Sequence, residues 1–339
     1  MSETEINNRE QSFIYFKEGP KLKQVLDHPV PRTNMITSIP EGVPFNRGYE
    51  NKITEAEGIN QISNYINEVK TISQKNSNKN SQETLQLATS FGENLVFLGE
   101  HELQEASYGL ARHIIETAQQ GKTVYLYPYQ DRSPQYITLR ILEEIDSQTE
   151  QFPEIRGRIK LETDTSAIAR RCAIDPDHSK VLIPDDFILS GTKLKGAMGQ
   201  VNSELLKKEL DPKKIIEGVV IASPIRDNEN LKSLTEYGNI ISYYGIPEVK
   251  NPSGGWMFDS GVAMTGSWCS VDYGFQTTIK RLHDYLSKQN DNLPTPKLYN
   301  IQRPYEKDEK RTTEYKDLDL QRMWEKVKRK YALYPGIHP

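Results

Sequence analysis

The sequence predicts an α/β fold built around a parallel sheet. From Asn94 onward, short apolar runs alternate with segments of helical periodicity, which is typical of parallel strands joined by crossover helices. About six such runs can be counted, and Val181–Ile183 is apolar without interruption, as expected of a strand buried on both faces. The 339 residues are enough for one large domain or two modest ones.

The segment 1–90 is expected to be an N-terminal extension that wraps over the rest. Its first part is rich in Asn, Glu, Lys and Pro and has little periodicity, which indicates loop. Ile59, Ile62, Ile66 and Val69 recur at steps of three and four, so an amphipathic helix is predicted there. The tract "SQKNSNKNSQET" that follows is polar and of low complexity, and we expect a mobile linker.

The segment 91–250 is expected to be the α/β core. The predicted strands are "NLVFLG", "KTVYLYPY", "RIKLET", "KVLIPDD", "EGVVIASP" and "NIISYYG". A helix should follow the first of them, because Ala106, Leu110, Ile114 and Ala118 share one face. A second should carry Ile137, Ile141 and Ile145, and a third should cover "TKLKGAMGQVNSELLKKEL".

The segment 251–339 is expected to form a small C-terminal hood and a charged helical tail. It begins with a Gly-, Ser- and aromatic-rich stretch and continues with a helix from about residue 276 to 288. In the tail, Leu318, Leu320, Met323 and Val327 form a stripe that would dock on one side of the molecule.

Composition narrows the classes of function. The formal net charge of −4 argues against a nucleic-acid-wrapping protein, because phosphate neutralisation needs a basic excess. The longest apolar runs are much shorter than a membrane span, and the polar start lacks the apolar core of a secretory signal. The two cysteines, Cys172 and Cys269, make neither a disulfide framework nor a four-cysteine zinc site. We therefore expect a cytoplasmic protein without a membrane segment.

Two adjacent acids mark the candidate site. Asp185 and Asp186 stand at the carboxyl end of a predicted buried strand, the edge at which open α/β sheets bind ligands. Ser190, Gly191 and Thr192 then form a turn into a helix, whose N–H groups and dipole suit a phosphate. Gly191 is expected to approach that phosphate or to need a conformation easy only for glycine. Because carboxylates accept hydrogen bonds and repel phosphate, the acids should hold a neutral diol of the same ligand.

A phosphate with a vicinal diol a few ångströms away is a ribose 5-phosphate, and "VLIPDDFILSGT" at Val181–Thr192 resembles the fingerprint of type I phosphoribosyltransferases. The resemblance implies a Rossmann-like parallel sheet with a hood, and it implies transfer of a 5-phosphoribosyl group to a nitrogen acceptor. The donor would be 5-phosphoribosyl 1-pyrophosphate (PRPP) with Mg²⁺, and pyrophosphate would be released. The acceptor would be a nucleobase or a related heterocycle.

The resemblance also assigns residues by position. Asp185 and Asp186 would hold the ribose hydroxyls and would meet magnesium mainly through the ligand, while Ser190–Lys193 would wrap the 5-phosphate. The pyrophosphate loop of the family follows its first core strand, and Gly99, Glu100 and His101 occupy that position here.

Family members cover the active site with a hood and stack the acceptor base on an aromatic ring, which makes Trp256, Trp268 and Tyr273 the candidate acceptor pocket. A lid that excludes water would come from residues 129–134 or from the tract near Asn76.

Several alternatives remain open at the level of sequence. The acids and the turn are also compatible with a polar loop and helix cap in any doubly wound fold, whereas "SGTKLKG" lacks the ending of a Walker phosphate loop. A regulatory module that senses PRPP on the same fold, or a relative that makes or degrades such ligands, would carry the same motif. A homodimer is compatible with either function. Arg170 and Arg171 could bind an anionic ligand, or they could be cations that interact favourably with the C-terminal end of a helix. Cys172 is predicted to be a core residue rather than a nucleophile.

Overall fold

The protein is described by a computed structural model that covers residues 13–21, 24, 55–75, 78–129, 133–188, 191–225, 232–247, 262–264, 271–288, 290, 293 and 295–296. The chain divides into two compact units. Unit 1 comprises residues 1–18, 104–245 and 320–339, and unit 2 comprises residues 19–103 and 246–319. Each unit thus collects segments that are distant in the sequence.

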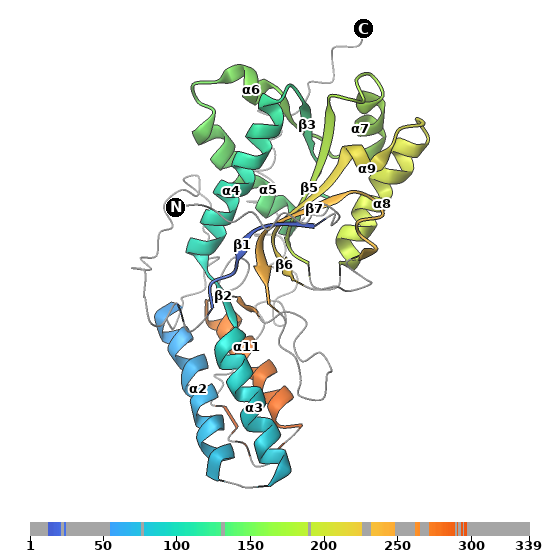
Figure 1. The fold of residues 1–339 in the computed structure, drawn as a ribbon. Helices are drawn as coiled ribbons and strands as arrows, with labels where there is room; N and C mark the ends of the chain where they lie inside the picture. The colour runs from blue at the N-terminus through green and yellow to red at the C-terminus, as the bar shows by residue number, and fades with distance from the viewer. Residues whose placement is uncertain are drawn as a thin grey trace, which may run out of the picture. The chain divides into compact units, whose positions relative to one another are not determined.

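Unit 1 is built on a six-stranded sheet in the order β1-β7-β6-β5-β3-β4 (Figure 1). The pairs β1–β7, β5–β6, β3–β5 and β3–β4 are all parallel. The strands are β1 (Phe13–Glu18), β3 (Thr123–Leu126), β4 (Ile159–Leu161), β5 (Ser179–Phe187), β6 (Ile216–Pro224) and β7 (Asn239–Ile246). The predicted α/β class with a parallel sheet is confirmed at this level.

Helices lie on both faces of this sheet (Figure 1). They are α4 (Glu100–Gln119), α5 (Ser133–Gln148), α6 (Pro153–Gly157), α7 (Thr165–Cys172), α8 (Thr192–Leu206) and α9 (Pro212–Ile215). Residues of α7 and α8 form one buried cluster with Val181 and Ile183 of β5 and with Tyr125 of β3. On the other face, the predicted stripe of α4 is confirmed, since Ala106, Leu110, Ile114 and Ala118 are buried.

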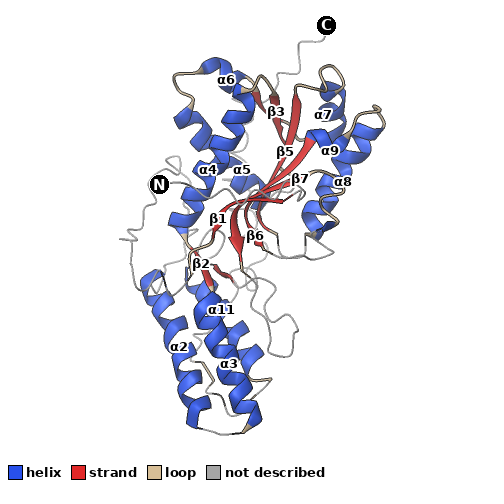
Figure 2. Cartoon of the chain, viewed as in Figure 1, coloured by secondary structure: helices blue, strands red, loops and turns tan. Residues whose placement is uncertain are grey.

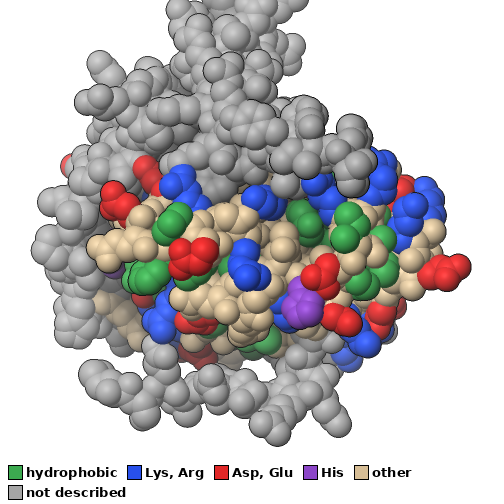
Figure 3. All heavy atoms as spheres, turned by 90° about the horizontal axis from the view of Figure 1, so that it is seen from above, with side chains coloured by type: hydrophobic (Ala, Val, Ile, Leu, Met, Phe, Trp, Pro, Cys, Tyr) green, Lys and Arg blue, Asp and Glu red, His purple; other side chains and the backbone are tan. Residues whose placement is uncertain are grey.

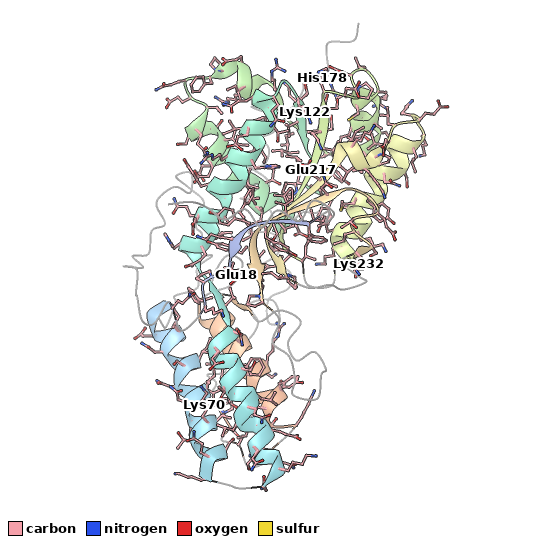
Figure 4. All side chains as sticks on the ribbon, in the orientation of Figure 1. Glu18, Lys70, Lys122, His178, Glu217 and Lys232 are labelled. Carbon is pink, nitrogen blue, oxygen red and sulfur yellow. The ribbon has the colours of Figure 1, made fainter. Side chains whose placement is uncertain are left out.

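The direction of the strands fixes where their carboxyl ends lie. In Figure 4, Lys122 and His178, which precede β3 and β5, lie at one end of the sheet, and Glu18, the last residue of β1, lies toward the other. All parallel pairs therefore present their carboxyl ends on the side where β1 ends.

The prediction of the first core strand is wrong, because this strand does not belong to the large sheet. "NLVFLG" contains β2 (Val96–Leu98), which pairs with β8 (Val262–Met264) in a separate two-stranded sheet. The sixth strand of the large sheet is instead β1, from a segment expected to be loop. β1 adds to the edge of the sheet and none of its residues is fully buried, so it lacks the buried apolar run of the central strands, and pairing with β7 identifies it as a strand.

Unit 2 contains three packed helices, which Figure 2 shows running side by side. These are α2 (Glu55–Lys75), α3 (Lys79–Asn94) and α11 (Val271–Leu286). The predicted helix around Ile59–Val69 is confirmed as α2, and its four stripe residues are buried. They pack in one core with Phe91 of α3 and Leu282 of α11.

The expected polar linker at Ser73–Thr84 is wrong at both ends, because Ser73–Lys75 belong to α2 and Lys79–Thr84 belong to α3. α3 begins at Lys79, and the Asn78 side chain caps it by accepting from the Ser81 N–H at 2.7 Å. Thr84 and Leu87 are buried, so packing against α2 offsets the ordering of this polar segment. The boundaries expected at residues 90 and 250 therefore do not separate the two units, because α2 and α3 share a core with α11.

None of the described helices combines the length and the apolar character that crossing a membrane requires.

Candidate functional site

The two acids lie in the last residues of β5. The strand is buried from Ser179 to Asp185 and half-buried at Asp186 and Phe187, and it stays paired with β6 through Phe187. Asp185 stands opposite Val220, inside the ladder. Both acids thus lie within the strand predicted from "KVLIPDD", and Asp185 is buried, with an exposed fraction of 6%.

The acids also lie where the order of strands reverses. From β3 the chain moves outward to β4, and it then returns to form β5 on the other side of β3. Ligands of open α/β sheets bind in the crevice beyond the carboxyl ends of the strands at such a switch point. The carboxyl ends of β3 and β5 therefore define the candidate site, from topology and independently of the sequence motif.

Tyr129 connects these two strand ends. It follows β3 by three residues, and its hydroxyl donates a hydrogen bond to Asp185 Oδ2 at 2.5 Å. Burial and the neighbouring Asp186 charge raise the pKa of Asp185 to about 8, although the Tyr129 hydrogen bond acts in the opposite direction. Burial and the same two carboxyl groups also raise the pKa of Tyr129. Both groups therefore favour their protonated forms near neutral pH.

Asp186 has a different environment. It is half-buried, its Oδ1 accepts from the Phe187 N–H at 2.8 Å, and its own N–H donates to Asp185 Oδ1 at 2.9 Å. Of the two acids, Asp186 is the one that solvent reaches more readily.

The turn into α8 contains a left-handed residue, as predicted for Gly191. Gly191 is the N-cap of α8, with φ of 73° and ψ of −5°, and a Cβ atom added there would lie 2.9 Å from Leu234 Cδ1. No capping side chain bonds to this helix start from the N-cap position, and Thr192 and Lys193 are exposed. The first turn thus presents donors and one cation to solvent. Ser190 lies outside the described residues.

The other sequence candidates for the site belong to unit 2 or lie outside the described residues. Gly99, Glu100 and His101 belong to unit 2, where a helix rather than a loop follows β2 immediately. The Gly99 N–H donates to the Glu102 carboxylate at 2.9 Å, and His101 is exposed. Trp256 and Trp268 lie outside the described residues, as does the side chain of Tyr273, whose backbone lies in α11.

Arg170, Arg171 and Cys172 have contacts that a structural role explains. Arg170 and Arg171 stand in the last turn of α7, with carboxylate oxygens of Asp164 and Glu162 at 3.9 and 3.6 Å, respectively. Cys172 is buried in the core, and burial raises the pKa of its thiol to about 11. These positions agree with the interpretation of the arginines as helix-end cations and of the cysteine as a core residue.

A charged cluster that sequence analysis missed lies near the amino ends of β5 and β6. Lys180 Nζ donates to Glu217 Oε1 at 2.5 Å, and His113 Nε2 of α4 lies 3.4 Å from Glu217 Oε2. Burial alone would raise the pKa of Glu217, but His113 and Lys180 lower it to about 2. Figure 4 shows Glu217 within the sheet, and its position inside the strand "IEGVVIASP" was the available signal.

The surface at the amino ends of the strands carries a mixture of side-chain types. Figure 3 views the molecule from that end, and acidic, basic and apolar side chains are interspersed over the part that is coloured. Mixed charge of this sort is typical of a solvated surface and selects no particular ligand.

Metal ligands are sparse in the described ranges, where no three His, Cys, Asp or Glu side chains come together as a metal site. Asp186 supplies the carboxylate oxygen that Mg²⁺ prefers, whereas both oxygens of Asp185 already accept hydrogen bonds. These residues fit a magnesium ion that arrives on the phosphates of a ligand and touches the protein at few points.

No family model matches this sequence, and no curated protein matches it.

Proposed function

We propose that this protein binds PRPP with Mg²⁺ at the carboxyl ends of β3 and β5 and transfers its 5-phosphoribosyl group to a nitrogen acceptor. The observation that carries the proposal is the succession of a buried parallel strand, Asp185 and Asp186 at its end, and a left-handed Gly191 that opens α8. The succession lies at the switch point of the sheet, where a ligand would contact both the acids and the helix start.

The start of α8 is suited to the 5-phosphate. Its first N–H groups and the helix dipole attract an anion, and the exposed Thr192 and Lys193 add a hydroxyl donor and a positive charge. Gly191 gives this turn its left-handed backbone conformation, and the space that a side chain would take is filled by Leu234.

The acids are suited to the ribose. An ionised carboxylate only accepts hydrogen bonds, so Asp186 can receive the two hydroxyls of a vicinal diol while it repels a phosphate. In this arrangement, the acids hold the sugar and the helix start holds the phosphate, which orients the ligand along the sheet edge.

The pyrophosphate end of the ligand would lie beside β3. Because β3 is the neighbour of β5 in the sheet, the segment that follows β3 from Tyr129 onward is the better counterpart of the family's pyrophosphate loop than Gly99–His101. Magnesium bound to the pyrophosphate would stabilise the charge of the leaving group. The bond between C1 and the pyrophosphate oxygen breaks, a nitrogen lone pair of the acceptor forms the new bond, and that nitrogen then loses its proton.

The experiment combines calorimetric binding of PRPP in the presence of Mg²⁺ with pyrophosphate release across a panel of heterocyclic bases. We expect Asp186→Asn to weaken binding by about a hundredfold, since it removes a charged partner of two hydroxyls. Asp177→Asn is the matched control, because this exposed acid precedes the same strand at its other end. Absence of PRPP binding by the wild type would refute the proposal, and binding without turnover on any base would support a PRPP sensor instead.

A further inference from the structure

The hydrogen bonds of Asp185 leave it with a different role from Asp186. Asp185 Oδ2 accepts from the Tyr129 hydroxyl at 2.5 Å, and Asp185 Oδ1 accepts from the Asp186 N–H at 2.9 Å. Both carboxyl oxygens are thus engaged within the protein, on a side chain that is almost fully buried.

Packing of the Tyr129 side chain against the core helps to hold its hydroxyl beside Asp185. Tyr125, Tyr127 and Tyr129 alternate along and beyond β3, and all three pack against the core formed with α7 and α8. The Tyr127 hydroxyl donates to Gln200 of α8 at 3.1 Å, so only the last tyrosine of the series bonds to Asp185. Its bond joins the residues after β3 to the end of β5, across the switch point.

We propose that Tyr129 is a positioning residue for the ligand site, which acts through Asp185, and that Asp186 is the acid in direct contact with the ligand's diol. This inference rests on the proposed function, because the diol is that of the phosphoribosyl ligand. Tyr129 holds the Asp185 carboxyl, and the carboxyl holds the Asp186 backbone N–H. This chain of hydrogen bonds fixes the backbone that carries the Asp186 side chain, whose Oδ1 also accepts from the Phe187 N–H.

The first measurement is the affinity for PRPP with Mg²⁺ of Tyr129→Phe, Asp185→Asn and the double variant. We expect each single variant to lose roughly tenfold in affinity, the effect of losing one buried hydrogen bond. The double variant should lose no more than Asp185→Asn alone, because both changes break one chain of contacts. Tyr127→Phe is the control, since it removes the same hydroxyl two residues earlier without touching Asp185.

The second measurement separates positioning from general stability and needs no ligand. The Asp185 carboxyl is followed by ¹³C NMR as a function of pH, with Asp185→Asn used for assignment. Because the Tyr129 hydrogen bond lowers the pKa of Asp185, Tyr129→Phe should move the titration midpoint upward, and Tyr127→Phe should leave it in place.

The outcomes distinguish the inference from the function on which it rests. Wild-type affinity in Tyr129→Phe, additive losses in the double variant, or an unmoved Asp185 midpoint would overturn the role of Tyr129 while PRPP binding stands. An Asp186→Asn protein with undiminished affinity would overturn the division between the two acids. Failure of the wild type to bind PRPP would overturn the proposed function, and with it this inference.

Discussion

At the scale of single residues, Asp185 is held in surroundings that favour its neutral form. It is buried beside Asp186 and receives the Tyr129 hydroxyl, and its pKa of about 8 lies above the unfolded value of about 3.9. Between these two values the folded protein keeps a proton that the unfolded chain has lost. Folding therefore becomes less favourable as the pH rises through this window, and the stability is present below it.

Asp185→Asn should remove this dependence on pH. We expect the free energy of unfolding of the wild type to fall relative to that of the variant between about pH 5 and pH 8. The slope should be about 1.36 kcal/mol per pH unit, so the total change should reach up to about 4 kcal/mol. Urea unfolding at several pH values measures the difference. Asp177→Asn, at an exposed site, should follow the wild-type curve, and parallel curves for Asp185→Asn would show that this carboxyl is ionised in the folded state.

Gly191 is the residue whose backbone conformation decides the start of α8. Gly191→Val should destabilise the protein by about 1 to 3 kcal/mol, because a branched side chain is strained at a φ of 73° and its Cβ would crowd Leu234. PRPP affinity should fall with it. Gly196→Ala, in the same helix with nothing near its added Cβ, should instead stabilise by about 0.5 to 1 kcal/mol. Chemical unfolding compares the two, and a Gly191→Val protein with normal stability and affinity would exclude the phosphate cradle.

At the scale of elements, β5 carries ionisable groups near both of its ends. Asp185 near the carboxyl end faces Tyr129, whereas Lys180 near the amino end pairs with Glu217 of β6 and, through it, with His113 of α4. The pKa of Glu217 lies at about 2, below its unfolded value, so its contribution to stability is present above about pH 4.3. This contribution is lost as the pH falls toward 2, opposite in sign to that of Asp185.

Glu217→Gln should therefore cost about 3 kcal/mol near neutral pH, since it removes a buried charge and leaves Lys180 without its partner. The deficit should shrink as the pH is lowered to about 3. Glu116→Gln, which breaks an exposed pair with Arg112 in α4, should leave stability nearly unchanged. Urea unfolding at both pH values tests this, and a deficit that does not depend on pH would mean that Glu217 acts through shape and not charge.

At the scale of the whole molecule, two of the buried clusters among the described residues lie in different units. One joins α7 and α8 to β3, β5 and β6, and the other joins α2, α3 and α11. The candidate site belongs to the first of them. The helices of the second come from both sides of the sheet segment in the sequence, so this core joins parts of the chain that are distant in the sequence.

Phe91→Ala should reveal this division. Phe91 is fully buried in the α2–α3–α11 core, and its truncation should cost roughly 3 to 5 kcal/mol there. By hydrogen exchange, the amides of α2, α3 and α11 should lose protection more than those of β5 and β6. Val220→Ala in the other core should show the reverse pattern. Equal loss of protection throughout the chain would indicate one cooperative core.

Some features of this protein are determined by the sequence alone because their causes are local. The stripes of α2 and α4 and the buried run of β5 follow from periodicity, and the left-handed turn follows from a glycine between a strand and a helix. The place of the acids at a strand's carboxyl end was readable for the same reason, although their unequal burial was not.

Other features were decided only by tertiary structure, because they depend on which strands become neighbours. Pairing with β8 removes β2 from the large sheet, pairing with β7 makes β1 a strand, and packing against α2 orders the polar start of α3. The contact between Tyr129 and Asp185 spans 56 residues and exists because the chain returns past β3 to form β5. Periodicity reports the burial of a residue but not the identity of its partner, so the site's hydrogen bonds could be found only in the folded chain.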